Sequence, residues 1–74
     1  MTYTFHIVLR PEPEGGYTVL VPSLPGCISF GKTEEEAKTM ATDAIRGYLE
    51  VLKEEGEEIR DDHDAIETSI SLAA

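Results

Sequence analysis

The stretch that decides the fold reads Leu24-Pro25-Gly26-Cys27-Ile28-Ser29-Phe30-Gly31-Lys32-Thr33-Glu34-Glu35-Glu36-Ala37. Pro25-Gly26 is a turn dipeptide, because proline presets φ at the second turn position and glycine accepts the positive φ of the third. Residues 27–30 have the length and composition of a short buried strand, and Gly31 ends it. The stretch therefore predicts a turn, a strand and a second break in direct succession.

A helix is predicted to begin immediately after that break. Thr33 is the expected N-cap, and Glu36, three residues later, completes a capping-box pattern. Glu34, Glu35 and Glu36 place negative charge at the positive end of the helix dipole. We interpret these carboxylates as capping and dipole-stabilising groups rather than as a catalytic pair.

Two strands are predicted before the organising stretch. Residues 3–9 alternate, with Tyr3, Phe5, Ile7 and Leu9 on one side and His6 and Val8 on the other. Residues 17–21 alternate in the same way, with Leu20 on the side opposite Val19. The prolines and glycines of residues 11–16 form the connection, so the default pairing is an antiparallel hairpin.

The helix is predicted to run from Glu34 to about Glu55. Its apolar residues recur at helical spacing and form one stripe: Ala37, Met40, Ala41, Ala44, Ile45, Tyr48, Leu49 and Leu52. Gly56 is suited to the left-handed residue that closes a helix. A close approach of the helix to the sheet would explain Gly47, which is unfavourable inside a helix.

Beyond the charged connector 57–64, residues 66–72 alternate again and predict a fourth strand. The predicted fold is α+β, with the element order β-β-β-α-β. A right-handed crossover through the helix would place the last strand beside the first, in a four-stranded mixed sheet of order 3-2-1-4. One helix then covers one face, and the face that carries His6, Val8 and Leu20 stays uncovered.

Length and charge limit the functional classes. The chain has 74 residues and is expected to form one domain, 1–74, near the lower size limit for independent folding. A net charge of −9 disfavours direct binding to nucleic acid and favours a basic partner. Because no apolar run approaches the length of a membrane span and no signal peptide is apparent, we expect no membrane association. The single cysteine, Cys27, fits a reducing, cytoplasmic location.

Side chains with catalytic potential do not assemble into a recognisable motif. Cys27 is expected to be a small buried hydrophobe rather than a nucleophile. The run Asp61-Asp62-His63-Asp64 is expected to be a solvated acidic loop rather than a metal site. His6 is a strand histidine or, on the sharper hypothesis, an interface contact. We expect no cofactor, no metal and no enzymatic activity.

The ordered set of motifs resembles the HicB antitoxin family. The resemblance rests on four pieces: residues 16–27 with the Leu-Pro-Gly-Cys turn, residues 31–37 with the helix start, Tyr48-Leu49, and residues 55–59 after the helix. It implies a partial ribonuclease H-like fold and an antitoxin that masks a small basic HicA-like toxin, which cleaves messenger RNA with a histidine. Ser23 stands where many relatives carry aspartate. Because the sequence stops at Ala74, we expect no operator-binding domain.

We therefore expect a binding protein that self-associates as a homodimer or higher homo-oligomer. The predicted partner-binding residues are His6, Val8, Leu20, Glu34 and Glu35. Two other classes stay open. One is an orphan oligomeric module of the same family that binds a small ligand, and the other is a metal-dependent hydrolase on a ribonuclease H-like fold.

Overall fold

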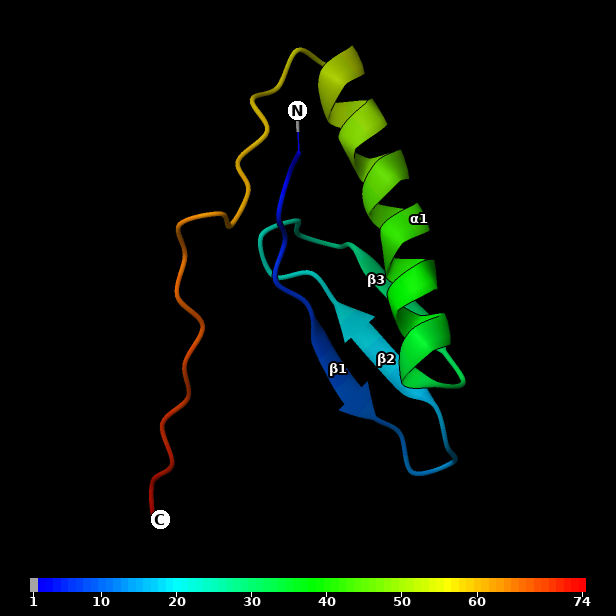
Figure 1. Cartoon of the computed structure of the whole chain (residues 1–74), viewed down its shortest axis with the longest axis vertical. Coiled ribbons are helices and arrows are strands. Elements are labelled where there is room, and N and C mark those ends of the chain that lie inside the picture. Colours follow the sequence, from blue (N-terminus) through cyan, green and yellow to red (C-terminus); the bar gives the residue numbers. More distant parts are fainter. Residues whose placement is uncertain (1) are drawn as a thin grey trace.

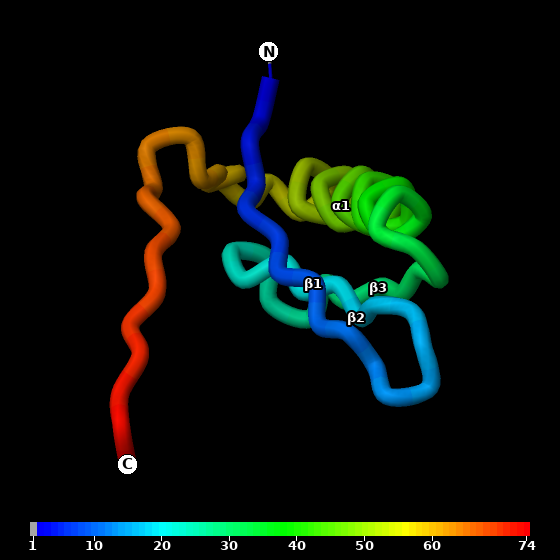
Figure 2. Tube along the Cα trace, turned by 60° about the horizontal axis from the view of Figure 1, so that its bottom comes forward, coloured from blue at the N-terminus to red at the C-terminus, as the bar shows by residue number. Residues whose placement is uncertain are grey.

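The computed structural model describes residues 2–74 and contains a three-stranded sheet and one helix. The strands are β1 (Val8–Pro11), β2 (Tyr17–Leu20) and β3 (Ile28–Gly31), and the helix is α1 (Glu34–Glu54). The sheet has the order β1-β2-β3, with both pairs antiparallel. The helix lies along one face of the sheet, in contact with β2 and β3 (Figures 1 and 2).

The turn before β3 forms as predicted. The backbone N–H of Cys27 donates to the carbonyl of Leu24 at 2.9 Å, and Gly26 has a φ of +82°. These are the features of a turn that needs glycine at its third position. The Tyr48 hydroxyl of α1 donates to the carbonyl of Pro25 at 2.9 Å and so ties the turn to the helix.

Both ends of α1 are confirmed. Thr33 is extended, and its hydroxyl accepts the N–H of Glu36 at 3.0 Å, as an N-cap does. At the other end the N–H of Gly56 donates to the carbonyl of Lys53, and Gly56 has a φ of +71°. The first turn carries the three glutamates, so the predicted charge complement to the helix dipole is also in place.

The core lies between the helix and the sheet in two adjoining clusters. Val19, Ala37 and Ala41 form the first, and Val21, Leu24 and Cys27 form the second. Small alanines on the helix face allow a close approach to the sheet, which brings Gly31 against the first turn of α1. A Cβ at Gly31 would overlap the backbone of Glu36 and Ala37, so only glycine fits at this position without a shift of the helix.

The structure corrects two expectations about this packing. The strand before Gly31 is not buried throughout, since Ile28 and Phe30 are exposed and β3 begins at Ile28 rather than at Cys27. Gly47 is not at a close contact, because a Cβ there would meet nothing within 4 Å. Cys27 is buried as predicted.

The predicted fourth strand is wrong, and with it the order 3-2-1-4 and the mixed sheet. Within residues 2–74 the sheet has only the order β1-β2-β3, and residues 66–72 belong to no strand. The N–H of Ala65 donates to the carbonyl of Asp62, a local turn after which the chain runs apart from the sheet (Figures 1 and 2). The apolar residues of this segment are consequently left in water: Ile66, Ile70 and Leu72.

Candidate functional site

One face of the sheet carries apolar side chains that the helix does not cover. Val8 pairs with Leu20, and Leu20 pairs with Ile28, so these three side chains share one face across all three strands. Phe30, two residues after Ile28, lies on the same face. The adjacent residue in β2, Val19, is fully buried on the helix side. We name Val8, Leu20, Ile28 and Phe30 the open face.

The open face is unusually exposed for residues of its type. Ile28 is 61% exposed and Phe30 47%, whereas Val8 and Leu20 are half-buried between their neighbours. An apolar patch of adjoining side chains on a small acidic protein is a typical feature of a protein-binding surface. The sequence identified Val8 and Leu20 for this face but missed Ile28 and Phe30, since a short apolar run does not show which of its residues are covered.

His6 and Val8 line one hollow at an edge of the open face. The hollow has a volume of about 340 Å³, and its other walls come from residues far away in the sequence: Pro22, Ser23, Asp62, Glu67 and Thr68. The His6 Nδ1 lies 3.8 Å from a carboxylate oxygen of Glu67, an ion pair when the imidazole is protonated. His6 and Val8 thus share this hollow, and Val8 pairs with Leu20 across β1 and β2.

Glu34 and Glu35 are separated from that group. They occupy the first turn of α1, directly after Gly31, and Gly31 pairs with Tyr17. Leu20 and Ile28 pair at the opposite end of the β2–β3 ladder. The five predicted partner-binding residues therefore form two regions, an apolar one around His6 and an acidic one at the start of the helix.

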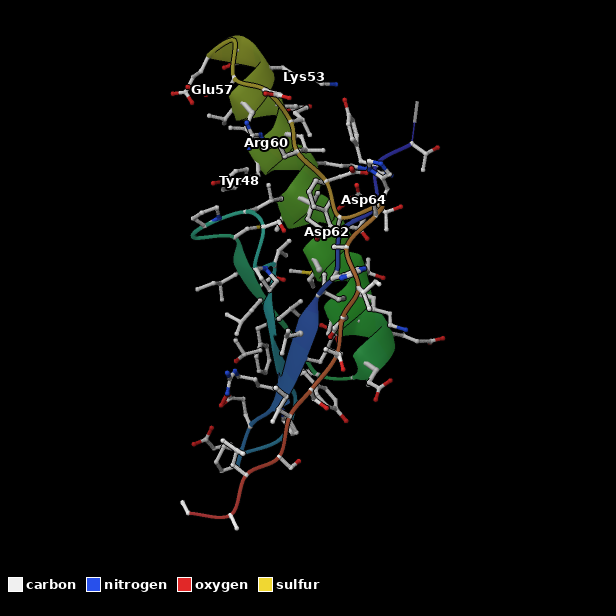
Figure 3. The ribbon with its side chains drawn as sticks, turned by 90° about the vertical axis from the view of Figure 1, so that its left-hand side faces the viewer. Tyr48, Lys53, Glu57, Arg60, Asp62 and Asp64 are labelled. Atoms are coloured by element: carbon white, nitrogen blue, oxygen red, sulfur yellow. The ribbon has the colours of Figure 1, made fainter. Side chains whose placement is uncertain are left out.

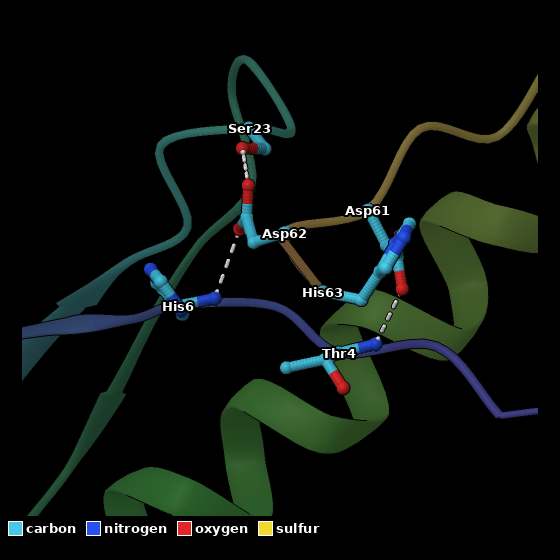
Figure 4. A network of polar contacts seen from close by, with 6 residues as sticks. All are labelled: Thr4, His6, Ser23, Asp61, Asp62 and His63. Carbon is cyan, nitrogen blue, oxygen red and sulfur yellow. Dashed lines mark hydrogen bonds and ion pairs between the residues drawn. The ribbon is translucent and has the colours of Figure 1, made fainter. Parts of the chain in front are cut away.

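A second group of polar contacts holds the segment after the helix against the N-terminal segment. We name it the carboxylate cluster: Thr4, His6, Ser23, Asp61, Asp62 and His63 (Figure 4). The Asp61 carboxylate accepts the N–H of Thr4 at 2.8 Å, and the Asp62 carboxylate accepts the N–H of His6 at 2.9 Å. The N–H of Asp62 donates in turn to the carbonyl of Thr4 at 2.7 Å.

Two side chains complete the carboxylate cluster. The Ser23 hydroxyl donates to Asp62 at 2.5 Å, and His63 Nδ1 lies 2.6 Å from Asp61 Oδ1. Figure 3 shows Asp62 and Asp64 on the descending segment that follows Glu57 and Arg60. Asp61 and Asp62 thus tie three parts of the chain together: the N-terminal segment, the β2–β3 turn and the segment after α1.

These contacts shift the ionisation of three residues. The hydrogen bond with His63 lowers the pKa of Asp61, and the bond from Ser23 lowers the pKa of Asp62, because both favour the carboxylate. The Asp61 carboxylate raises the pKa of His63 by stabilising the imidazolium. Burial raises the pKa of the Cys27 thiol, which disfavours the thiolate that a nucleophile requires.

The carboxylate cluster corrects the expectation of a wholly solvated acidic loop. Asp61 and Asp62 make specific contacts across a sequence separation of up to 57 residues. The sequence does contain a signal for these contacts, because the short aspartate side chain often accepts hydrogen bonds from backbone N–H groups outside regular structure. In residues 2–74 no group of three or more histidine, cysteine, aspartate or glutamate side chains is arranged to hold a metal ion.

Comparison with known proteins identifies the family. The profile described as "HicB_like antitoxin of bacterial toxin-antitoxin system" matches residues 5–72. A UPF0150 protein of Thermoplasma acidophilum is 43% identical over 63 residues, which cover 85% of this chain and 88% of the relative. A UPF0150 protein of Archaeoglobus fulgidus is 46% identical over 55 residues, with 72% and 80% covered.

A relative with a functional name is also similar. Antitoxin HicB 1 of Photorhabdus laumondii is 40% identical over 55 residues, which are 74% of this chain but 36% of that protein. A small α+β domain with an exposed apolar sheet face is the class that the structure defines. The chain belongs to the HicB-like antitoxin family of bacterial toxin–antitoxin systems. This membership supports an antitoxin role and favours a non-enzymatic one.

The described part of the chain, residues 2–74, contains no helix that is both long and apolar enough to cross a membrane.

Proposed function

We propose that this protein binds and masks a small basic HicA-like toxin, with the open face as the contact surface. The observation that carries the proposal is the apolar open face on a chain that belongs to an antitoxin family. Exposed Ile28 and Phe30, next to half-buried Leu20, offer an apolar centre of the kind that supplies most of the affinity in protein interfaces. The proposal includes a cytoplasmic location, where the buried Cys27 stays reduced.

Charge has a separate role in the proposal. The chain has 15 acidic and 6 basic residues, and acidic side chains gather in the first turn of α1 and around its end. A field of this sign attracts a basic toxin and raises its association rate, and salt screens the attraction. Glu34 and Glu35 therefore act at long range, whereas the open face determines how long the complex lasts.

A kinetic experiment with the purified HicA-like partner toxin distinguishes the role of charge from the role of the open face. Ile28→Asp should speed dissociation by about 10- to 100-fold, the effect of losing one central apolar contact. Val51→Asp is the matched control, since Val51 is 52% exposed and lies on α1, outside the open face. Glu34→Lys combined with Glu35→Lys should instead slow association, most strongly at low salt.

Surface plasmon resonance measures both rate constants for each variant. Equal dissociation rates for Ile28→Asp and Val51→Asp would remove the open face from the proposal. A wild-type protein that forms no complex with the HicA-like toxin would remove toxin binding itself.

A further inference from the structure

The hollow at the edge of the open face combines apolar walls with carboxylates. We name this space of about 340 Å³ beside His6 and Val8 the edge hollow. Val8 belongs both to the edge hollow and to the open face, so the two surfaces are continuous. Ligand sites in proteins occupy about 300–1,000 Å³, and the edge hollow lies at the lower end of that range. It therefore suits one long side chain of a protein that docks on the open face.

The Glu67 carboxylate in the edge hollow retains its capacity to accept hydrogen bonds. Its side chain is 61% exposed, and its nearest cationic neighbour within residues 2–74 is His6 Nδ1 at 3.8 Å, which is longer than a hydrogen bond. That contact is an ion pair only when the imidazole is protonated. A guanidinium group is always charged and offers several donors, so an arriving arginine would pair more strongly with Glu67 than His6 does.

Asp62 supplies a second carboxylate, and its orientation is fixed. Its Oδ1 accepts the Ser23 hydroxyl and its Oδ2 accepts the N–H of His6 (Figure 4). A carboxylate oxygen can accept two hydrogen bonds, so each oxygen of Asp62 keeps a further acceptor position. The hydrogen bond from Ser23 also lowers the pKa of Asp62 and so favours the ionised form. The edge hollow thus carries two negative charges.

The walls of the edge hollow match the two halves of a long basic side chain. Arginine and lysine have an apolar stem and a charged head. Val8 and Pro22 provide apolar contacts for the stem, and Glu67 and Asp62 provide counter-charges for the head. We propose that the edge hollow binds one arginine or lysine side chain of the HicA-like toxin. This inference rests on the proposed function, because it names the group of the toxin that anchors the complex beside the open face.

This anchor has a different kinetic role from Glu34 and Glu35. Those two residues lie at the start of α1, away from the open face, and attract the toxin at long range. A charge pair that borders a docked apolar surface is shielded from water, and breaking it changes mainly the dissociation rate. Removal of the Glu67 carboxylate should therefore shorten the life of the complex without slowing its formation.

A pair of charge-matched substitutions tests the anchor by surface plasmon resonance. Glu67→Gln should speed dissociation of the toxin about 10-fold and leave the association rate within about 2-fold of the wild type. Glu57→Gln is the control, since it removes the same charge from the segment after α1 but lies away from Asp62 and outside the edge hollow (Figure 3). Its dissociation rate should equal that of the wild type.

A second pair fills the edge hollow instead of neutralising it. Thr68→Arg places a guanidinium of this chain beside Glu67 and should weaken toxin binding about 10-fold. Ser71→Arg makes the same change of charge on the same segment, outside the edge hollow, and should bind like the wild type.

Substitutions in the toxin identify the side chain that is bound. Each arginine and lysine of the toxin is replaced by alanine in turn, and each variant is measured against the wild-type protein and against Glu67→Gln. One toxin variant should lose about 10-fold in affinity for the wild type and little more for Glu67→Gln, which is the non-additivity of two groups in contact.

A small probe tests the edge hollow without the toxin. N-acetyl-arginine amide, titrated at millimolar concentration, should shift the backbone amide NMR signals of His6, Ser23 and Thr68. N-acetyl-citrulline amide has a side chain of the same length without the charge and should not shift them. Glu67→Gln should remove the response to the arginine probe.

Two results would overturn the anchor while the proposed function stands: a toxin that dissociates from Glu67→Gln and Glu57→Gln at the same rate, or a toxin in which no arginine or lysine couples to Glu67. A wild type that binds no toxin would overturn the proposed function and the toxin as the occupant. Equal responses to the arginine and citrulline probes would exclude a cation site in the edge hollow.

Discussion

Two glycine-to-alanine substitutions should change stability in opposite directions. At Gly31 a Cβ would overlap the backbone of Glu36 and Ala37. Neither side of this contact is a flexible side chain, so the helix start must shift away from β3. At Gly47 a Cβ meets nothing within 4 Å, and alanine is the better helix former.

The magnitudes follow from these environments. Overpacking costs about 1–3 kcal/mol, and Gly31→Ala should cost about 3 kcal/mol because the added Cβ would overlap backbone atoms rather than a flexible side chain. A domain of this length has a free energy of unfolding of about 4–11 kcal/mol, so the loss is a large fraction of it. Gly47→Ala should raise the free energy of unfolding by up to about 1 kcal/mol.

Thermal unfolding followed by circular dichroism, at one fixed protein concentration, measures both effects. At about 4–8 °C per kcal/mol, Gly31→Ala should melt about 12–24 °C below the wild type, and Gly47→Ala a few degrees above it. The fixed concentration matters because a dimer melts at a concentration-dependent temperature. If Gly31→Ala melted with the wild type, the close contact between β3 and α1 would be refuted.

Three further predictions concern caps and charges, each read from urea denaturation midpoints. Ser23→Asp should destabilise the fold, although an exposed turn would tolerate either residue, because it removes the hydroxyl that donates to Asp62 and places a second negative charge beside that carboxylate. Adding Asp62→Asn should restore part of the lost stability, because it removes the repulsion between the two carboxylates. Thr33→Ala should cost about 1 kcal/mol, since Thr33 caps α1, and an unchanged midpoint would exclude that role. Asp61 and Asp62 have lowered pKa values, so the stability that they contribute is present above about pH 4 and is lost as the pH falls through the lowered values. His63 has a raised pKa, so the stability that it contributes is present below about pH 6.5 and is lost as the pH rises through the raised value. His63→Ala should abolish this second dependence.

Local chemistry predicted most of the elements. The turn and both helix ends could be predicted because each depends only on neighbouring residues: Pro25-Gly26 forms the turn, Thr33 caps the start of the helix, and Gly56 closes its end. The helix-facing side of the sheet followed from the alternation of residues 3–9 and 17–21, because alternation identifies a face directly.

Long-range arrangement could not be predicted in the same way. The alternation of residues 66–72 indicates a preference for extended structure but does not supply a partner strand, and the fourth strand is absent from the described chain. The contacts of Asp61 and Asp62 with Thr4 and His6 depend on where the helix returns the chain, which no local pattern encodes. For the same reason the sequence predicts that Ile28 and Phe30 are buried, whereas the structure exposes both on the open face.

The most direct test of the proposed antitoxin function is inhibition of messenger RNA cleavage by the purified HicA-like toxin that is proposed as its partner. Increasing amounts of the wild-type protein should abolish cleavage once the two proteins are present in equal amounts. Val51→Asp should do the same, and Ile28→Asp should need a concentration about 10- to 100-fold higher, since it weakens the open face. Cleavage that continues unchanged in an excess of the folded wild-type protein would contradict the proposal.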